Sequence, residues 1–265
     1  MIRPLISQGI RSNCKLYIVF LSIIAMYAVT LVAMYDPSLK HSLKSLEESM
    51  PVVLSAFGMQ DMGTTLLDFI ITYLYKFVLI VTPFIFSIVM CYRLLAKYVE
   101  NGSLAYLLNS KHGRTKIVLT QWTNLFLGLV LMIIFNTVLM IVCCSIMFTG
   151  ELDIPRFLLL NFGLLGLQVF IASFCFMFAC LFNDVKYSIG SGGGLISLFI
   201  IMQMLFSVYD DAKILCYCNP LSLFNPQQII NGCTASIICL AILWGLSIIF
   251  LFIGLAGFTR KDLPI

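Results

Sequence analysis

Few residues in this sequence have the types and spacing that bond-making chemistry needs. The two histidines, His41 and His112, lie far apart in the chain, and neither belongs to an H-E-x-x-H pattern that could hold a catalytic zinc. Ser191 lies in the glycine-rich stretch 189–194, but the predicted topology brings no histidine close enough to act as its base. The same stretch lacks the Lys-Ser or Lys-Thr pair of a phosphate-binding loop. We therefore expect that the chain is not an enzyme, that it holds no metal or cofactor, and that it does not hydrolyse ATP by itself.

The ten cysteines fall into two groups. Those in or beside apolar runs are expected to behave as small buried hydrophobic side chains: Cys14, Cys91, Cys143, Cys144, Cys175, Cys180 and Cys239. Cys216, Cys218 and Cys233 share one polar segment instead. A disulfide from Cys233 to Cys216 or Cys218 is one interpretation if that segment faces an oxidising exterior, and free thiols are the other. Three thiols without a nearby histidine are a poor match to a zinc site.

Three strongly polar residues inside apolar runs are candidates for a cavity or gate: Lys76, Asn136 and Gln168. A lysine deep in lipid is costly, so Lys76 either faces an internal cavity or a partner chain, or extends its ammonium toward the membrane surface. Asn136 and Gln168 are equally suited to hydrogen bonds between helices. Pro83 predicts a kink in the helix that contains Lys76.

These residues sit in a chain whose composition requires lipid as its solvent. The chain has 265 residues, of which 61% are hydrophobic and 11% charged, whereas soluble domains carry about 25% charged residues. Apolar runs long enough to cross a membrane predict six transmembrane helices at about 16–35, 69–95, 121–148, 157–182, 194–208 and 235–258. The sequence therefore predicts an all-α integral membrane protein with a single domain, 1–265. The first run is too long for a signal peptide core and no convincing cleavage site follows it, so we expect it to be an anchor.

The positive charges predict the orientation of these spans. The termini and the second and fourth connections carry most of the basic residues: Arg3, Arg11, Lys15, Arg93, Lys97, Lys111, Arg114, Lys116, Lys186, Arg260 and Lys261. The other connections carry Lys40, Lys44, Arg156 and Lys213. Since cytoplasmic loops are enriched in Lys and Arg, both termini are expected in the cytoplasm. The scattered basic residues give no nucleic-acid-binding pattern.

The exterior connection between spans five and six contains two Asn-Pro pairs, Asn219-Pro220 and Asn225-Pro226. Its mixture of apolar pairs and prolines predicts short helices that dip into the outer interface, with each Pro ending a turn.

The connection between spans two and three has a composition of its own. Residues 100–116 read ENGSLAYLLNSKHGRTK, with three leucines at helical spacing followed by basic residues. A helix with this pattern either docks on a partner protein or rests on anionic lipid. The stretch resembles the E-x-G-[ST]-L-x-x-L-L-[ST] segment and following Arg of bacterial ABC-2-type permeases. The residues that match it are Glu100, Gly102, Ser103, Leu104, Leu107, Leu108 and Arg114. The usual Pro after the leucines is replaced by Lys111, His112 and Gly113.

Two further stretches resemble the same family. Residues 48–59, ESMPVVLSAFGM, are similar to its exterior segment before span two, and residues 257–265, GFTRKDLPI, to its closing F-x-R-[RK]-D-[LI]. The resemblance implies the membrane subunit of an exporter in the bacterial cytoplasmic membrane. It implies two copies of a partner ATPase that binds ATP and Mg, and a second permease that is identical or homologous. The ATPase-coupling residues would be Glu100, Gly102, Leu104, Leu107, Leu108 and Arg114.

The same resemblance implies a short cytoplasmic coupling helix between spans two and three, and re-entrant exterior helices between spans five and six. Because the spans contain few charges, we expect an amphipathic or hydrophobic cargo, such as a toxin-like peptide or a drug. Two other functions stay open from the residues alone. A secondary transporter or channel would need buried ionisable residues or broken helices, and a membrane scaffold would need neither.

Overall fold

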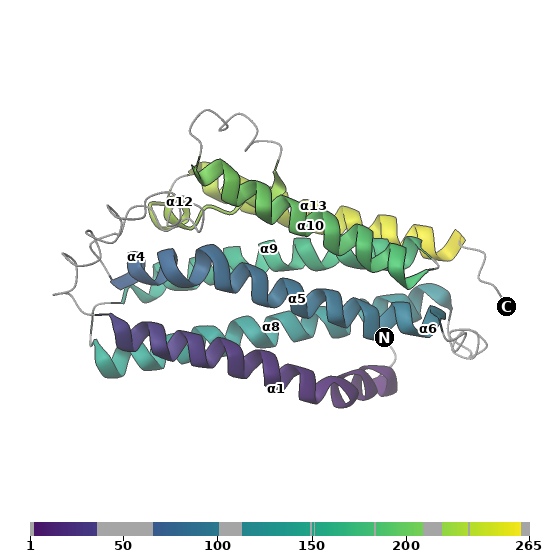
Figure 1. The fold of residues 1–265 in the computed structure, drawn as a ribbon, viewed down its shortest axis with the longest axis horizontal. Helices are drawn as coiled ribbons and strands as arrows, with labels where there is room; N and C mark the ends of the chain where they lie inside the picture. Colours follow the sequence, from purple (N-terminus) through teal and green to yellow (C-terminus); the bar gives the residue numbers. More distant parts are fainter. Residues whose placement is uncertain are drawn as a thin grey trace.

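Figure 1 shows the computed structural model of the chain, in which residues 3–35, 66–100, 113–148, 150, 152–182, 184–208, 219–232 and 234–260 are described. Within these ranges the chain forms a bundle of helices, and six helical stretches are long and apolar enough to cross a membrane. The prediction of an all-helical, multi-pass membrane protein is therefore confirmed. Each of the six predicted spans overlaps one of these stretches.

The described helices follow in chain order, and the second span is interrupted by two π-helical stretches. They are α1 (Arg3–Met34), α4 (Leu66–Ile70), the π-helix η2 (Ile71–Val78), α5 (Leu79–Cys91), the π-helix η3 (Tyr92–Ala96), α6 (Lys97–Glu100), α8 (Arg114–Met147), α9 (Ile154–Leu181), α10 (Val185–Val208), the 3-10 helix η5 (Pro220–Leu223), α12 (Pro226–Ile230) and α13 (Thr234–Arg260).

Helix α9 forms the centre of the bundle. It packs against α5, α8, α10 and α13, while α1 packs mainly against α8 (Figure 1). In its most apolar stretch 78% of the residues are buried within the chain, against 22% in α10 and in α13. An all-round apolar helix belongs in a core, so α9 is the core helix and the outer helices present apolar side chains to lipid.

Small residues let the neighbours of α9 approach its backbone closely. A Cβ placed on Gly254 of α13 would lie 3.1 Å from the Cα of Met177, and one on Gly192 of α10 would lie 3.2 Å from the Cα of Cys175. Such contacts favour association in lipid, where dispersion packing replaces the hydrophobic effect between helices.

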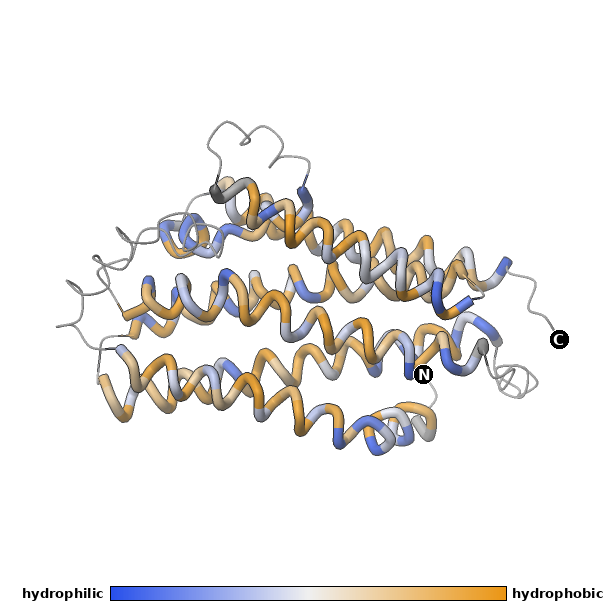
Figure 2. The backbone as a smooth tube through the Cα atoms, viewed as in Figure 1, coloured by the Kyte–Doolittle hydropathy of each residue, from blue (hydrophilic) through white to orange (hydrophobic). Residues whose placement is uncertain are grey.

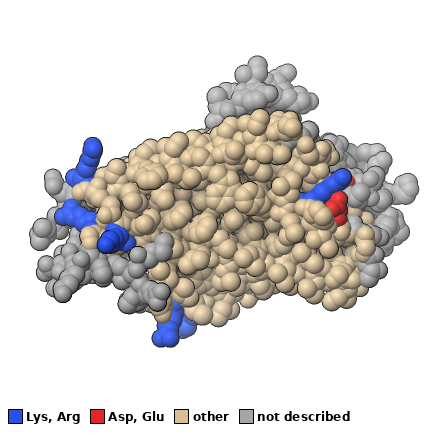
Figure 3. Space-filling view, turned by 180° about the vertical axis from the view of Figure 1, so that it is seen from behind, with Lys and Arg blue, Asp and Glu red and all other residues tan. Residues whose placement is uncertain are grey.

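Charge and hydropathy divide the bundle along its length. The middle of the helices is apolar, and polar residues gather toward the two ends (Figure 2). On the face seen in Figure 3, the Lys and Arg side chains lie toward the two ends of the molecule, with an uncharged band between them. Helix α1 begins and α13 ends at the same end of the bundle as α6 (Figure 1). We call this the basic end; described residues there include Arg93, Lys97, Arg114, Lys186 and Arg260.

Two local predictions differ from the structure. The fifth helix begins at Val185 rather than near residue 194, because the glycine-rich stretch is helical and Gly192 packs on α9. The prolines of the two Asn-Pro pairs begin helices rather than end them. Asn219 and Asn225 accept hydrogen bonds on their Oδ1 atoms from the backbone N–H groups of Leu221 and Gln228, at 3.1 and 3.3 Å. Proline suits the first helical position because an N–H there has no helical partner.

Candidate functional site

The predicted ATPase-coupling residues are only partly within the described structure. Gly102, Leu104, Leu107 and Leu108 lie outside the described residues. The residues that flank this segment are described: the backbone of Glu100 ends α6, and Arg114 begins α8 with an exposed side chain. Helix α6 lies at the basic end of the bundle (Figure 1).

The predicted exterior cysteines, Cys216, Cys218 and Cys233, also lie outside the described residues. The other seven cysteines are described and are free thiols, of which Cys91, Cys144, Cys175 and Cys180 are buried among the helices. The prediction that cysteines in apolar runs act as small buried side chains holds for these four.

The three gate candidates lie on three different elements. Lys76 is half-buried on η2, ten residues after α4 begins, which places it roughly 15 Å along the span. Asn136 on α8 and Gln168 on α9 are fully buried. Asn136 and Gln168 are not hydrogen-bonded to each other, since neither polar atom of the Asn136 side chain has a partner within the described residues. The structure therefore does not join them into one polar site.

Gln168 instead contacts the second span at its proline. Pro83 lies inside α5 and has no N–H to donate to the carbonyl of Leu79, four residues earlier. The Nε2 atom of Gln168 donates to that carbonyl oxygen at 2.7 Å and to the Ile80 carbonyl oxygen at 3.3 Å. A side chain of the core helix thus supplies the hydrogen bond that the proline removes, which is how broken helices are tolerated in lipid.

A second polar contact joins α9 to the second span about one turn earlier in the chain. The hydroxyl of Tyr75 on η2 donates to Oδ1 of Asn161 at 2.9 Å, and Asn161 Nδ2 donates to the Phe157 carbonyl at 2.8 Å. The Tyr75 ring also makes an edge contact with Phe157, with centroids 6.1 Å apart. Because Tyr75 and Asn161 are both buried, each satisfies a group that would otherwise be costly in the interior.

These contacts define the candidate site as a polar seam between the second span and α9: Tyr75 with Asn161, and Leu79 with Gln168. The seam lies where the second span departs from regular α-helix, with η2 before α5, Pro83 within it, and η3 after it. Stretches of π-helix within α-helices are frequent at functional sites. These hydrogen bonds join the second span to α9 beside the proline that interrupts the backbone hydrogen bonding of the span.

Part of this seam was not predicted from the sequence. The proline signalled that a carbonyl at Leu79 would need a donor, but nothing in the sequence assigned Gln168 to it. Tyr75 carried no signal, because a tyrosine in an apolar run is as compatible with the lipid interface as with the core.

Neither a protein-family model nor a curated protein matches this sequence. The described residues establish a multi-pass helical membrane protein with a proline-containing second span, and they assign it no activity.

Proposed function

We propose that this chain is the membrane-spanning permease subunit of an ATP-driven exporter of the ABC-2 type. The observation that carries the proposal is where the segment resembling the coupling helix is anchored. Residue 100 ends α6 at the basic end of the bundle, and Arg114 starts α8. A segment with an apolar face and basic residues, placed there in a chain without a nucleotide-binding motif, suits a site for a separate ATPase.

The second span is suited to carry movement from that segment into the bundle. It continues directly from α6 through η3 to α5, and it meets α9 through Gln168 and Tyr75. Closure of two ATPase subunits on ATP and Mg would move the coupling segment, and Pro83 would give the span a point at which its packing against α9 can change. Transport then requires that cargo binds the packings before and after this change with different affinity.

The short helices before α13 support the proposed outer gate. Phe224 and Ile229 are buried, and a Cβ on Gly163 of α9 would lie 3.3 Å from the Phe224 ring and 3.2 Å from Ile229 Cδ1. Gly163 is nine residues into α9, roughly 14 Å from its start. Packing at this depth favours the proposal that η5 and α12 are re-entrant helices.

The apolar outer surfaces of the helices support the proposed class of cargo and the proposed second permease. The described membrane faces carry large apolar side chains without charges, including Ile201 on α10 and Phe252 on α13. Such faces can pack against lipid or a second permease, identical or homologous. A pathway bounded by them suits an amphipathic or hydrophobic cargo, such as a toxin-like peptide or drug.

Co-purification tests this function most directly. The tagged chain is expressed with the products of the neighbouring reading frames, solubilised in mild detergent and captured, and any bound nucleotide-binding subunit is identified and quantified. Leu107→Asp and Arg114→Glu are expected to abolish capture and cargo-stimulated ATP hydrolysis. Arg156→Glu, an exposed charge change at the opposite end, is the matched control and is expected to retain both.

Two results would overturn the proposal. One is that no nucleotide-binding subunit is captured by the wild-type chain. The other is transport by the purified chain that depends on an ion gradient and not on ATP, which would identify a secondary transporter or channel instead.

A further inference from the structure

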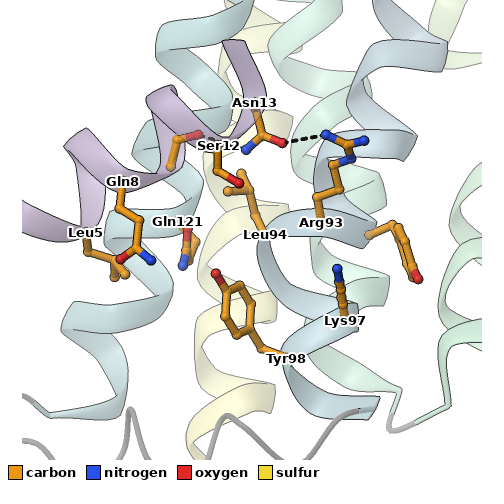
Figure 4. A pocket seen from close by; sticks show the side chains of 11 residues that line it. Leu5, Gln8, Ser12, Asn13, Arg93, Leu94, Lys97, Tyr98 and Gln121 are labelled. Carbon is orange, nitrogen blue, oxygen red and sulfur yellow. Dashed lines mark hydrogen bonds between the residues drawn. The ribbon is translucent and has the colours of Figure 1, made fainter. Parts of the chain in front are cut away.

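A polar cavity of about 450 Å³ opens at the basic end, between α1, the η3–α6 segment and α8. Figure 4 shows its side chains pointing in from all three elements. They are Leu5, Gln8, Gly9, Ser12 and Asn13 from α1, Tyr92, Arg93, Leu94, Lys97 and Tyr98 from η3 and α6, and Gln121 from α8. Its volume lies within the range of small-ligand sites.

The cavity is positively charged. Arg93 and Lys97, one helical turn apart, both line it. Neither forms an ion pair with a carboxylate among the described residues, where the one ion pair joins Arg156 and Asp153 near the opposite end. Two neighbouring cations repel each other, so an anion between them lowers the free energy of the site.

Arg93 is held in place for such an anion. Its Nη1 donates to Oδ1 of Asn13 at 3.2 Å, and the Asn13 side chain, 3% exposed, is fixed by donation from its Nδ2 to the Gly9 carbonyl at 2.8 Å. A guanidinium carries five N–H donors. The hydrogen bond to Asn13 therefore orients the group and leaves further donors to bind two oxygens of one phosphate.

The rest of the lining suits a polar head group with an apolar continuation. Gln8, Ser12 and Tyr98 bring groups that hydrogen-bond to ester or hydroxyl oxygens. Oε1 of the buried Gln121 side chain has no hydrogen-bond partner within the described structure. The lining therefore contains a polar atom whose hydrogen-bonding capacity these residues do not satisfy. Farther along α1, Ile18 and Val19 are exposed and apolar, as helix faces against acyl chains are.

We propose that this cavity binds the phosphate of an anionic phospholipid, with Arg93 and Lys97 as its cationic ligands and Asn13 as the residue that positions Arg93. The chemistry recognised is a phosphate ester. A lipid is favoured over a soluble phosphate because the cavity lies at the basic end, where the apolar middle of the bundle gives way to polar residues (Figure 2), as a head-group site requires. The site is independent of whether an ATPase partner exists.

Lipid retention by the intact chain tests the proposal. The full chain is reconstituted into nanodiscs of phosphatidylcholine with a minor fraction of phosphatidylglycerol, extracted into mild detergent, and its bound lipids are quantified by native mass spectrometry. The wild type is expected to retain phosphatidylglycerol selectively. Arg93→Gln and Lys97→Gln are each expected to reduce retention about fivefold, and the double variant more.

Matched variants distinguish a loss of this site from a general loss of positive charge and from misfolding. Lys186→Gln removes an exposed cation at the same end but outside the cavity and is expected to retain lipid as the wild type does. Arg93→Lys keeps the charge without the fork of donors, and Asn13→Leu keeps Arg93 without its anchor; both are expected to give intermediate retention. Retention that falls as much in Lys186→Gln as in Arg93→Gln would overturn the proposal.

Competition distinguishes the two sources of phosphate. Glycerol phosphate or inorganic phosphate added to the detergent extract is expected to leave the bound phosphatidylglycerol in place. Displacement of the lipid at low concentrations of either would overturn the lipid assignment in favour of a soluble ligand. Equal retention of phosphatidylcholine and phosphatidylglycerol by the wild type would overturn the proposal altogether.

Discussion

Gln168 of α9 donates its Nε2 hydrogen bond to the carbonyl oxygen of Leu79 on α5, across 2.7 Å. That carbonyl is the acceptor that Pro83 leaves without a helical donor. One buried amide therefore links the proline-containing part of the second span to the core helix.

A double-mutant cycle measures this coupling. Gln168→Met is expected to lower the free energy of unfolding by about 1 kcal/mol, since the Leu79 carbonyl loses its donor in lipid. In a Pro83→Ala background the N–H of residue 83 can donate to Leu79, so the same substitution is expected to be neutral or stabilising. Unfolding of the purified variants in mixed micelles measures all four proteins. An equal loss in both backgrounds would show that Gln168 does not compensate for the proline.

The Tyr75–Asn161 hydrogen bond predicts a loss of similar size at a second contact. Tyr75→Phe keeps the ring contact with Phe157 and leaves Oδ1 of Asn161 buried without its donor. We expect a loss of about 1 kcal/mol in stability, because an unsatisfied buried acceptor costs its desolvation. Tyr187→Phe, at an exposed position of α10, is the control and is expected to change nothing. Thermal unfolding of both variants in the same detergent checks the difference.

The glycines of α10 predict opposite outcomes for the same substitution two residues apart. Gly192→Ala places a methyl group 3.2 Å from the Cα of Cys175 and is expected to push α10 from α9, at a cost of about 1–3 kcal/mol. A Cβ placed on Gly194 would meet no atom of a packed neighbour within 4 Å, so Gly194→Ala is expected to be neutral or stabilising. Melting temperatures of the two variants provide the measurement. Similar losses at both positions would point to helix flexibility rather than packing.

A substitution at Asn136 is expected to change the stability of the protein and its export activity differently. Its side-chain oxygen and nitrogen are buried without partners in the described structure, so Asn136→Leu is expected to raise the free energy of unfolding by about 1 kcal/mol. If the amide serves a gate, export falls although the protein is more stable. Stability and export are measured on the same preparation in proteoliposomes. Raised stability with unchanged export would assign Asn136 no part in transport.

The helical membrane fold could be predicted from the sequence because runs of about 20 apolar residues admit few other structures in lipid. The details that failed depend on neighbours. The stretch 189–194 is rich in glycine, which weakens helices, yet it is helical in the structure. Within it, Gly192 lies where α10 packs closely on α9. Pro220 and Pro226 were predicted to end turns, but the asparagine before each one caps a helix that the proline begins.

The candidate site could be predicted only in its parts. Gln168 was identified as a buried amide, but its acceptor lies 89 residues away in the chain, and no local pattern encodes such a pair. Arg93 and Lys97 were interpreted as markers of orientation. They line one cavity together with Asn13, which accepts a hydrogen bond from Arg93. Asn13 lies on a helix that begins well before the first predicted span.

The central position of α9 also constrains the order in which the protein can be made. The second span is synthesised before α9, so the Leu79 carbonyl and the Tyr75 hydroxyl are made before Asn161 and Gln168 exist to bond them. Until the fourth span is inserted, the nascent second span holds a proline-broken helix in lipid without its side-chain donor. A chain that stops before α9 would therefore keep the Leu79 carbonyl without the donor that Gln168 supplies, and we expect such a chain to pack its second span less stably.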